Sequence, residues 1–153
     1  MNVFILHENP DVNAKYHIDK HVVKMIIEEA QLLCSAHWVS GGEAPYKLTH
    51  KNHPCSIWTR ESLSNYNYLC DCAVALCEEY TFRYGKKHKT EDVINWCCNN
   101  KPNINDIGLT EPAKAMPDEY KCDSVIDSYR KYYMGEKRKF ASWKNRNKPE
   151  WFI

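Results

Sequence analysis

The sequence predicts an all-α domain, and three observations support that prediction. Apolar side chains recur at three- and four-residue steps over long stretches, which is the spacing of one helical face. Glycine and proline are scarce, with five and seven residues among 153, which disfavours a loop-rich β-sandwich. The strand signal is confined to a short start. We therefore expect residues 1–153 to form a single compact bundle of about four to five helices.

The first third of the chain predicts one long, interrupted helix. Residues 2–7 are apolar and extended or strand-like. A helix should begin at Pro10, because proline at the first helical position loses no hydrogen bond. The helical pattern then runs to about Trp38 with a break near Asp19, and two glycines end it. Residues 46–54 form a polar, histidine-bearing loop.

The remainder predicts three further helices. Apolar residues at helical spacing indicate one long helix over residues 54–84, ended by Gly85. Another should start after Thr90, followed by a long connection that contains three prolines. A fourth helix is expected from Asp123 or Ser124 to about Met134, and a fifth over residues 136–143.

Charge alone leaves the partner open. The formal net charge is +1, but the last 24 residues are strongly basic. Such a segment could follow the phosphates of a nucleic acid, or it could be an ordinary solvated helix. A second basic group near the end of the predicted 54–84 helix, from Arg83 to Lys89, is expected to be a solvated loop. The basic residues of the last segment are Arg130, Lys131, Lys137, Arg138, Lys139, Lys144, Arg146 and Lys148.

Cysteine usage points to a reducing compartment. None of the eight cysteines forms a Cys-x-x-Cys pair, so a structural zinc site is not expected. The chain starts without a basic leader, and no apolar run is long enough for a membrane span. We therefore expect a cytoplasmic protein with no membrane partner, whose cysteines act as small buried apolar residues.

A narrow polar stripe lies on the helix predicted before Trp38. His17, His21, Lys24, Glu28 and Gln31 fall within an arc of roughly 80° at 100° per residue. Most of the other positions are apolar, so this is a largely buried helix with one polar seam. The seam either lines a cleft and faces a ligand, or forms an internal network in which Lys24 pairs with Glu28.

The same stripe raises the question of a metal. His17 and His21 are four residues apart, a spacing that can hold a divalent ion if a third ligand comes from elsewhere. Two histidines alone are weak support for such a site, and we expect no metal and no other cofactor.

A second candidate cluster opens the helix predicted at residue 54. His50, His53 and Arg60 near a helix start could bind an anion, since free backbone N–H groups and the helix dipole favour phosphate there. Trp58 could stack on a base, although a tryptophan at such a position is more often part of the core.

These residues resemble a known family. Asp19, Lys20 and His21 followed by Glu28 resemble the Asp-Gln-His…Glu stretch in the first helix of phage endonuclease V, the pyrimidine-dimer DNA glycosylase. A wider family of phage and bacterial pyrimidine-dimer-DNA-glycosylase-like proteins is more closely similar. The shared features are a start like Met1–Leu6, the pattern of Lys24, Glu28 and Gln31, the His53-Pro54…Trp58 motif, and a late helix like residues 128–133.

The resemblance implies an endonuclease-V-like all-α fold and a cofactor-free DNA glycosylase and abasic-site lyase of phage DNA repair. An N-terminal α-amine would attack the sugar C1′ and displace a damaged or modified base, with Glu28 as the catalytic carboxylate. The substrate would be oriented by His17, His21, Lys24 and Gln31. His50, His53, Trp58 and Arg60 would contact it nearby, and the basic C-terminal region, including Arg130, would hold the backbone. A phage-encoded protein would act inside the host cell.

The chain departs from that family at its start. The family exposes its amine by removing the initiator methionine before a small residue, whereas Asn2 is expected to block that removal. The nucleophile would then be the amine of Met1, displaced by one residue. Lys20 or Lys24 could act instead.

Two other functions fit the same inventory. One is a phage counter-defence protein that binds or degrades a nucleotide second messenger, which predicts a closed, deep pocket. The other is a non-catalytic helical interaction domain, in which Lys24 and Glu28 simply pair. The DNA enzyme instead predicts an open basic groove.

Overall fold

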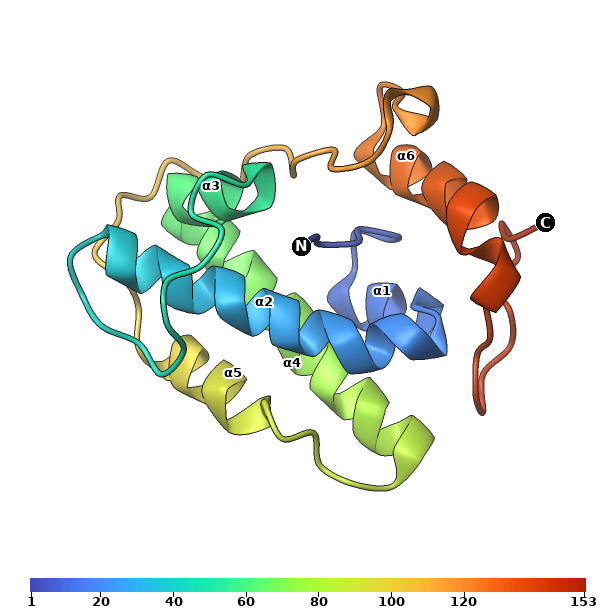
Figure 1. Ribbon diagram of the computed structural model, residues 1–153, viewed down its shortest axis with the longest axis horizontal. Coiled ribbons are helices and arrows are strands. Elements are labelled where there is room, and N and C mark those ends of the chain that lie inside the picture. The colour runs from blue at the N-terminus through green and yellow to red at the C-terminus, as the bar shows by residue number, and fades with distance from the viewer.

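The computed structural model describes residues 1–153, and all of its regular elements are helical (Figure 1). This confirms the all-α prediction, with six helices rather than four or five. No helix combines the length and apolar character needed to cross a bilayer. The helices are α1 (Pro10–Tyr16), α2 (Asp19–Val39), α3 (Pro54–Glu61), α4 (Leu63–Tyr84), α5 (Glu91–Asn99) and α6 (Val125–Tyr132).

The two long helices α2 and α4 form the centre of the fold, with α1, α3 and α5 packed against one or both of them (Figure 1). A single apolar core includes Ile26 and Leu33 of α2 and Leu69 and Leu76 of α4, all of which are fully buried. His21 and Glu28 of the polar stripe are buried on α2 while Lys24 is exposed, so the two buried side chains need protein partners or a ligand.

The break predicted near Asp19 is confirmed, and the structure shows what anchors it. Ile18 is extended between α1 and α2, and Asp19 Oδ1 accepts a hydrogen bond of 2.9 Å from Arg83 Nη1. Arg83 Nε also donates to Glu79 at 2.8 Å, and the Arg83 side chain is completely buried. The prediction that Arg83 belongs to a solvated loop is therefore wrong. Its buried guanidinium links Asp19 at the start of α2 to Glu79 near the end of α4.

The helix predicted over residues 54–84 is two helices. Ser62 is extended between α3 and α4, with φ −151° and ψ 143°. Its hydroxyl donates to Asp106 and accepts from the backbone of Ile107, while Leu63 N donates to Asn105 O. The long proline-containing connection thus supplies the hydrogen bonds that replace helical ones at this point.

The predicted fifth helix over residues 136–143 does not form. The chain continues from α6 through a π-helical turn, η2 (Tyr133–Lys137), and one 3₁₀ turn, η3 (Arg138–Phe140), after which it has no regular structure. This last segment is held by its own polar contacts: Arg146 donates to Glu79, and Trp143 Nε1 donates to Tyr16 O. Much of its basic character therefore serves the fold.

Candidate amine and carboxylate site

The N-terminus of the chain lies in the middle of the molecule, between α2, α3 and α6 (Figure 1). The Met1 amine is 3.1 Å from Glu28 Oε1, and the side chains of both residues are almost completely buried. Met1 as a whole is only partly buried, so its exposed area lies mainly on its main chain. The arrangement places the Met1 amine directly against a carboxylate on α2.

Asn2 fixes the position of that amine. Its Oδ1 accepts hydrogen bonds from the backbone of Val3 at 2.7 Å and from the Tyr129 hydroxyl at 3.0 Å. Its Nδ2 donates to Ala115 O at 2.8 Å, and the Cys55 thiol donates to Oδ1 from α3. With both ends of the amide satisfied in a buried site, the first residue has little freedom, which is what a positioned nucleophile requires.

Replacing Tyr129 by phenylalanine should loosen this anchor. We expect Tyr129→Phe to lower the free energy of unfolding by about 1–3 kcal/mol, because the buried Asn2 and Ala113 oxygens lose a donor. Denaturant unfolding measures the change. Tyr80→Phe is the matched control, since the Tyr80 hydroxyl makes no hydrogen bond within the protein, and an equal loss in both variants would contradict the anchoring role.

His21 lies beside the amine site and is a neutral hydrogen-bond donor. Its ring stacks on Phe4 at 4.3 Å, and its Nδ1 is 2.7 Å from the Tyr133 hydroxyl. That hydroxyl is fully buried, accepts from Ile18 N and contacts no acceptor other than Nδ1, so donating its proton to Nδ1 satisfies it and places the His21 hydrogen on Nε2. Nε2 has no protein partner but is not sealed from solvent, so it can donate to a substrate.

Burial, reinforced by neighbouring positive charges, lowers the pKa of His21 to about 2, and burial likewise lowers the pKa of His17 to about 4. Both rings are therefore neutral in the folded protein at neutral pH. In the unfolded chain both histidines have ordinary pKa values, so below about pH 6.5 the unfolded chain binds protons that the folded protein does not, and the free energy of unfolding falls. Below about pH 4 His17 is protonated in the folded protein as well, so it adds nothing further to this fall.

We expect each of these two histidines to lower the free energy of unfolding by about 2 kcal/mol as the pH is lowered from 6.5 to 5. Imidazole NMR signals check the cause directly, because neither His17 nor His21 should titrate above pH 5. A midpoint for either ring near pH 6.5 would contradict the buried neutral assignment. A His17→Asn variant should show a shallower pH dependence of stability over the same window.

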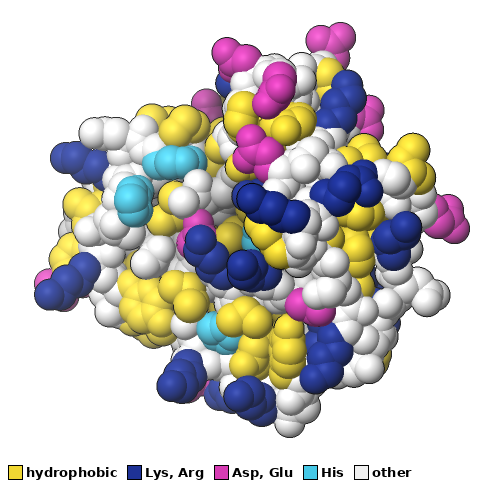
Figure 2. Space-filling model, turned by 45° about the vertical axis from the view of Figure 1, so that its right-hand side comes forward, with side chains coloured by type: hydrophobic (Ala, Val, Ile, Leu, Met, Phe, Trp, Pro, Cys, Tyr) yellow, Lys and Arg dark blue, Asp and Glu magenta, His cyan; other side chains and the backbone are white.

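Positive charges surround this site. After burial and the charge of His17, the charges of Lys137, Lys24 and Lys20 lower the pKa of His21. Lys24 Nζ is 3.9 Å from Glu28 Oε2, although its side chain is 68% exposed. The face turned forward in Figure 2 shows Lys and Arg side chains gathered near its middle beside a hollow, with histidines to one side. The surroundings of the amine therefore favour an anionic ligand.

Glu29 follows Glu28 in sequence but has a different environment. It is 1% exposed, and burial, followed by the charge of Glu28, raises its pKa well above the ordinary value. Burial therefore disfavours the charged form of Glu29, and Glu28 is the carboxylate that contacts the amine.

The structure places only some residues of the predicted polar stripe near the Met1 amine. Lys24 and Glu28 come together beside the amine, whereas His21 lies about two helical turns before Glu28 on α2. Gln31 lies about one turn beyond Glu28, half-buried with no hydrogen bond in the protein. His17 is fully buried, with Nδ1 bonded to Asn13 O. Nowhere in the chain do three or more His, Cys, Asp or Glu side chains form a group suited to a metal ion.

Of the cluster at the start of α3, the structure brings His53 toward the site. His53 caps α3 by accepting from Cys55 N at 3.0 Å, and burial, followed by the Met1 amine, lowers its pKa. His50 is exposed at a positive φ of 47°, and its charge also acts on His53. The Met1 amine and Glu28 both act on the His53 ring, which places this ring near the candidate site.

Three residues that were predicted to contact the substrate have structural roles instead. Trp58 is 4% exposed and its Nε1 donates to Thr110 O, so the prediction that it stacks on a base is wrong. Arg60 donates to Lys51 O at 2.6 Å and holds the preceding loop. Arg130 Nε donates to Leu6 O at 2.9 Å and its guanidinium packs over Trp151, which anchors the N-terminal segment.

The sequence patterns did not identify Asn2, Tyr129, Tyr133 or Lys137 as parts of this site. Asn2 belongs to the N-terminal segment itself, whereas α6 and η2 bring Tyr129, Tyr133 and Lys137 to that segment from more than a hundred residues along the chain. The sequence drew attention to Asn2 only for its effect on methionine removal. One sequence feature could have indicated its structural role: a polar residue in an otherwise apolar segment must find hydrogen-bond partners when it is buried.

Comparison with known proteins adds no family to this description: no family model, no curated protein and no solved structure matches the chain.

Proposed function

We propose that this protein is a DNA glycosylase and abasic-site lyase, acting on damaged or modified bases through the Met1 amine and Glu28. The observation that supports this most is the 3.1 Å contact between that amine and a carboxylate on α2. An α-amine loses its proton more readily than a lysine side chain does, and a carboxylate in contact can receive that proton. Such a pair is suited to imine formation with a sugar carbon.

The first half of the reaction replaces the base by the protein. Glu28 takes a proton from the amine, whose nitrogen lone pair attacks C1′. The bond from C1′ to the base breaks, the base keeps the electron pair, and it takes the proton from Glu28. Glu28 then removes a proton from the new secondary amine.

The second half opens the sugar and breaks the strand. The C1′–O4′ bond breaks as the nitrogen lone pair forms the protonated imine, and O4′ takes the proton held by Glu28. Glu28 next removes a proton from C2′, and the 3′-phosphate leaves with the C3′–O bonding pair. Water finally hydrolyses the imine and restores the amine.

An open basic site supports a polymeric substrate over a small nucleotide. Of eight hollows on the protein, none of the five main ones, of 260 to 620 Å³, is lined by Met1 or Glu28. None of these five therefore provides the deep pocket at the catalytic groups that a nucleotide-degrading protein would need. Lys20, Lys24 and Lys137 surround the site and could contact the phosphates that flank a reacting nucleotide. The damaged nucleotide would have to leave the base stack to reach the amine.

The geometry also favours catalysis over a purely structural role for Glu28. A structural stripe predicts that Lys24 satisfies Glu28, yet the Lys24 nitrogen is 3.9 Å away and mostly in solvent, while the Met1 amine is at 3.1 Å. Glu28 Oε2 has no hydrogen-bond partner although it is buried. An unpaired acceptor beside a positioned amine leaves room for the proton transfers described above.

The direct test is incubation with abasic and ultraviolet-irradiated duplex DNA, with and without borohydride. We expect strand cleavage, and we expect borohydride to reduce the imine to a stable protein–DNA adduct. Undamaged duplex of the same sequence is the control. No adduct and no cleavage on either damaged substrate would overturn the proposal.

A further inference from the structure

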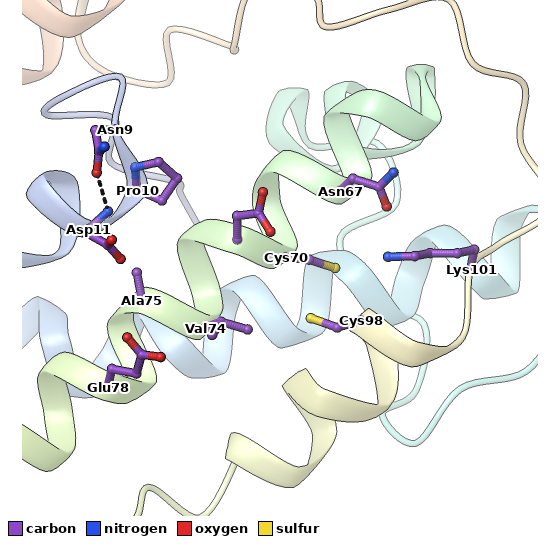
Figure 3. Close-up of a pocket in the computed structure, with 11 residues that line it drawn as sticks. Asn9, Pro10, Asp11, Asn67, Cys70, Val74, Ala75, Glu78, Cys98 and Lys101 are labelled. Carbon is purple, nitrogen blue, oxygen red and sulfur yellow. Dashed lines mark hydrogen bonds between the residues drawn. The ribbon is translucent and has the colours of Figure 1, made fainter.

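Helix α5 carries two adjacent cysteines, and each faces a cysteine on another helix. The Cys97 sulfur is 3.7 Å from the sulfur of Cys34 on α2. Figure 3 shows the sulfur atoms of Cys98 and of Cys70 on α4 pointing toward one another. All four are free thiols, so α5 lies against both of its neighbours through a thiol pair.

The two pairs differ in access. Cys34 and Cys97 are both fully buried, so no solute can reach them without opening the core. Cys70 and Cys98 instead line a hollow of about 600 Å³ between the start of α1, the outer face of α4 and the end of α5 (Figure 3). Cys98 is partly exposed in that hollow, whereas Cys70 lies behind it at 2% exposure.

The surroundings of Cys98 favour its thiolate. The neighbouring Cys70 thiol lowers the pKa of Cys98. Burial opposes this, Lys101 lowers the pKa further and Asp71 raises it, which leaves the pKa below the ordinary value. In the close-up the Lys101 amine reaches into the hollow near both sulfur atoms (Figure 3). An accessible thiolate next to a second cysteine is the arrangement found in redox-sensitive sites.

We propose that Cys98 and Cys70 form a redox-modification site, in which a peroxide oxidises Cys98 and Cys70 completes a disulfide. The Cys98 thiolate attacks one peroxide oxygen and breaks the O–O bond, which gives a sulfenic acid and, for hydrogen peroxide, hydroxide. The Cys70 sulfur then attacks the Cys98 sulfur and displaces the hydroxyl group as water once a proton is added. The two thiols lose two electrons, and the peroxide gains them.

This site is separate from the proposed DNA chemistry. None of the residues that line the hollow takes part in the Met1 and Glu28 arrangement. The disulfide would fasten α5 to α4 while leaving the buried Cys34 and Cys97 pair reduced. The buried pair is therefore an internal control on the same helix.

The test treats the reduced, folded protein with hydrogen peroxide, blocks the remaining thiols and maps disulfides by mass spectrometry. We expect two of the eight thiols to be lost, with a link between the tryptic peptides 61–83 and 90–114. Because the second peptide contains both Cys97 and Cys98, variants make the assignment. Cys97→Ser should keep the link, Cys98→Ser should abolish it, and Cys70→Ser should leave a sulfenic acid on Cys98 that dimedone captures.

Three results would overturn the proposal. The first is loss of the link in Cys97→Ser but not in Cys98→Ser, which would assign it to Cys97 instead of Cys98. The second is oxidation of Cys98 to a sulfinic acid while Cys70 stays reduced in the unsubstituted protein. The third is the absence of any thiol loss at peroxide concentrations that oxidise a free cysteine in the same tube. None of these outcomes depends on whether the protein cleaves DNA.

Discussion

Glu28→Gln should lower the rate of strand cleavage at abasic sites by about 10²- to 10⁴-fold, the range associated with a positioned acid–base group. The amide has nearly the same shape but can neither take the proton of the Met1 amine nor remove the proton at C2′. Binding to duplex DNA should remain within a few-fold, because the substitution removes a negative charge from a basic surface. Single-turnover cleavage and a separate binding titration measure the two effects.

The matched control is Glu78→Gln, an exposed carboxylate on α4 that lies away from the amine. It should cleave at the rate of the unsubstituted protein. If Glu28→Gln also retains that rate while remaining folded, Glu28 is not the catalytic carboxylate.

Arg83→Met should be among the most destabilising single changes, with an expected loss of about 3–5 kcal/mol of unfolding free energy. Removing the guanidinium leaves the carboxylates of Glu79 and Asp19 without their buried partner. Burial alone would raise the pKa of Glu79, but Arg146 and Arg83 more than offset this and hold it below the ordinary value. Replacing Arg83 removes part of the effect that holds the pKa of Glu79 down.

Denaturant unfolding at neutral pH tests this expectation. Lys87→Met is the control, because Lys87 pairs with Asp92 at 2.6 Å on the surface, where solvent screens the pair and its loss should change stability little. Similar losses for the two variants would mean that the buried network contributes no more than a surface ion pair.

Local signals identified most of the helices from the sequence. Pro10 after Asn9 marked the start of α1, and Gly85, at a φ of 68°, marked the end of α4. The break at Ser62 left no such signal, because its cause is a hydrogen bond to Asp106, 44 residues away. The π-helical turn after α6 was likewise invisible to helical periodicity, which continues through it.

Only part of the candidate site could be predicted, again because local sequence signals do not reveal contacts between distant segments. The stripe of His21, Lys24 and Glu28 follows from helical geometry on α2 alone. The groups that complete the site, Asn2 and Tyr133, belong to segments with no periodic relation to α2. Their positions depend on how the N-terminal segment threads between α2 and α6, which tertiary packing decides.

The central claim is that the Met1 amine forms the covalent bond to DNA, and locating the borohydride adduct tests it most directly. After nuclease and trypsin digestion, the account predicts the sugar remnant on the Met1 nitrogen of the peptide 1–15. A chain extended by two residues before Met1, which moves the amine away from Glu28, should give no adduct. A remnant on Lys20 or Lys24, or undiminished trapping of the extended chain, would contradict the account.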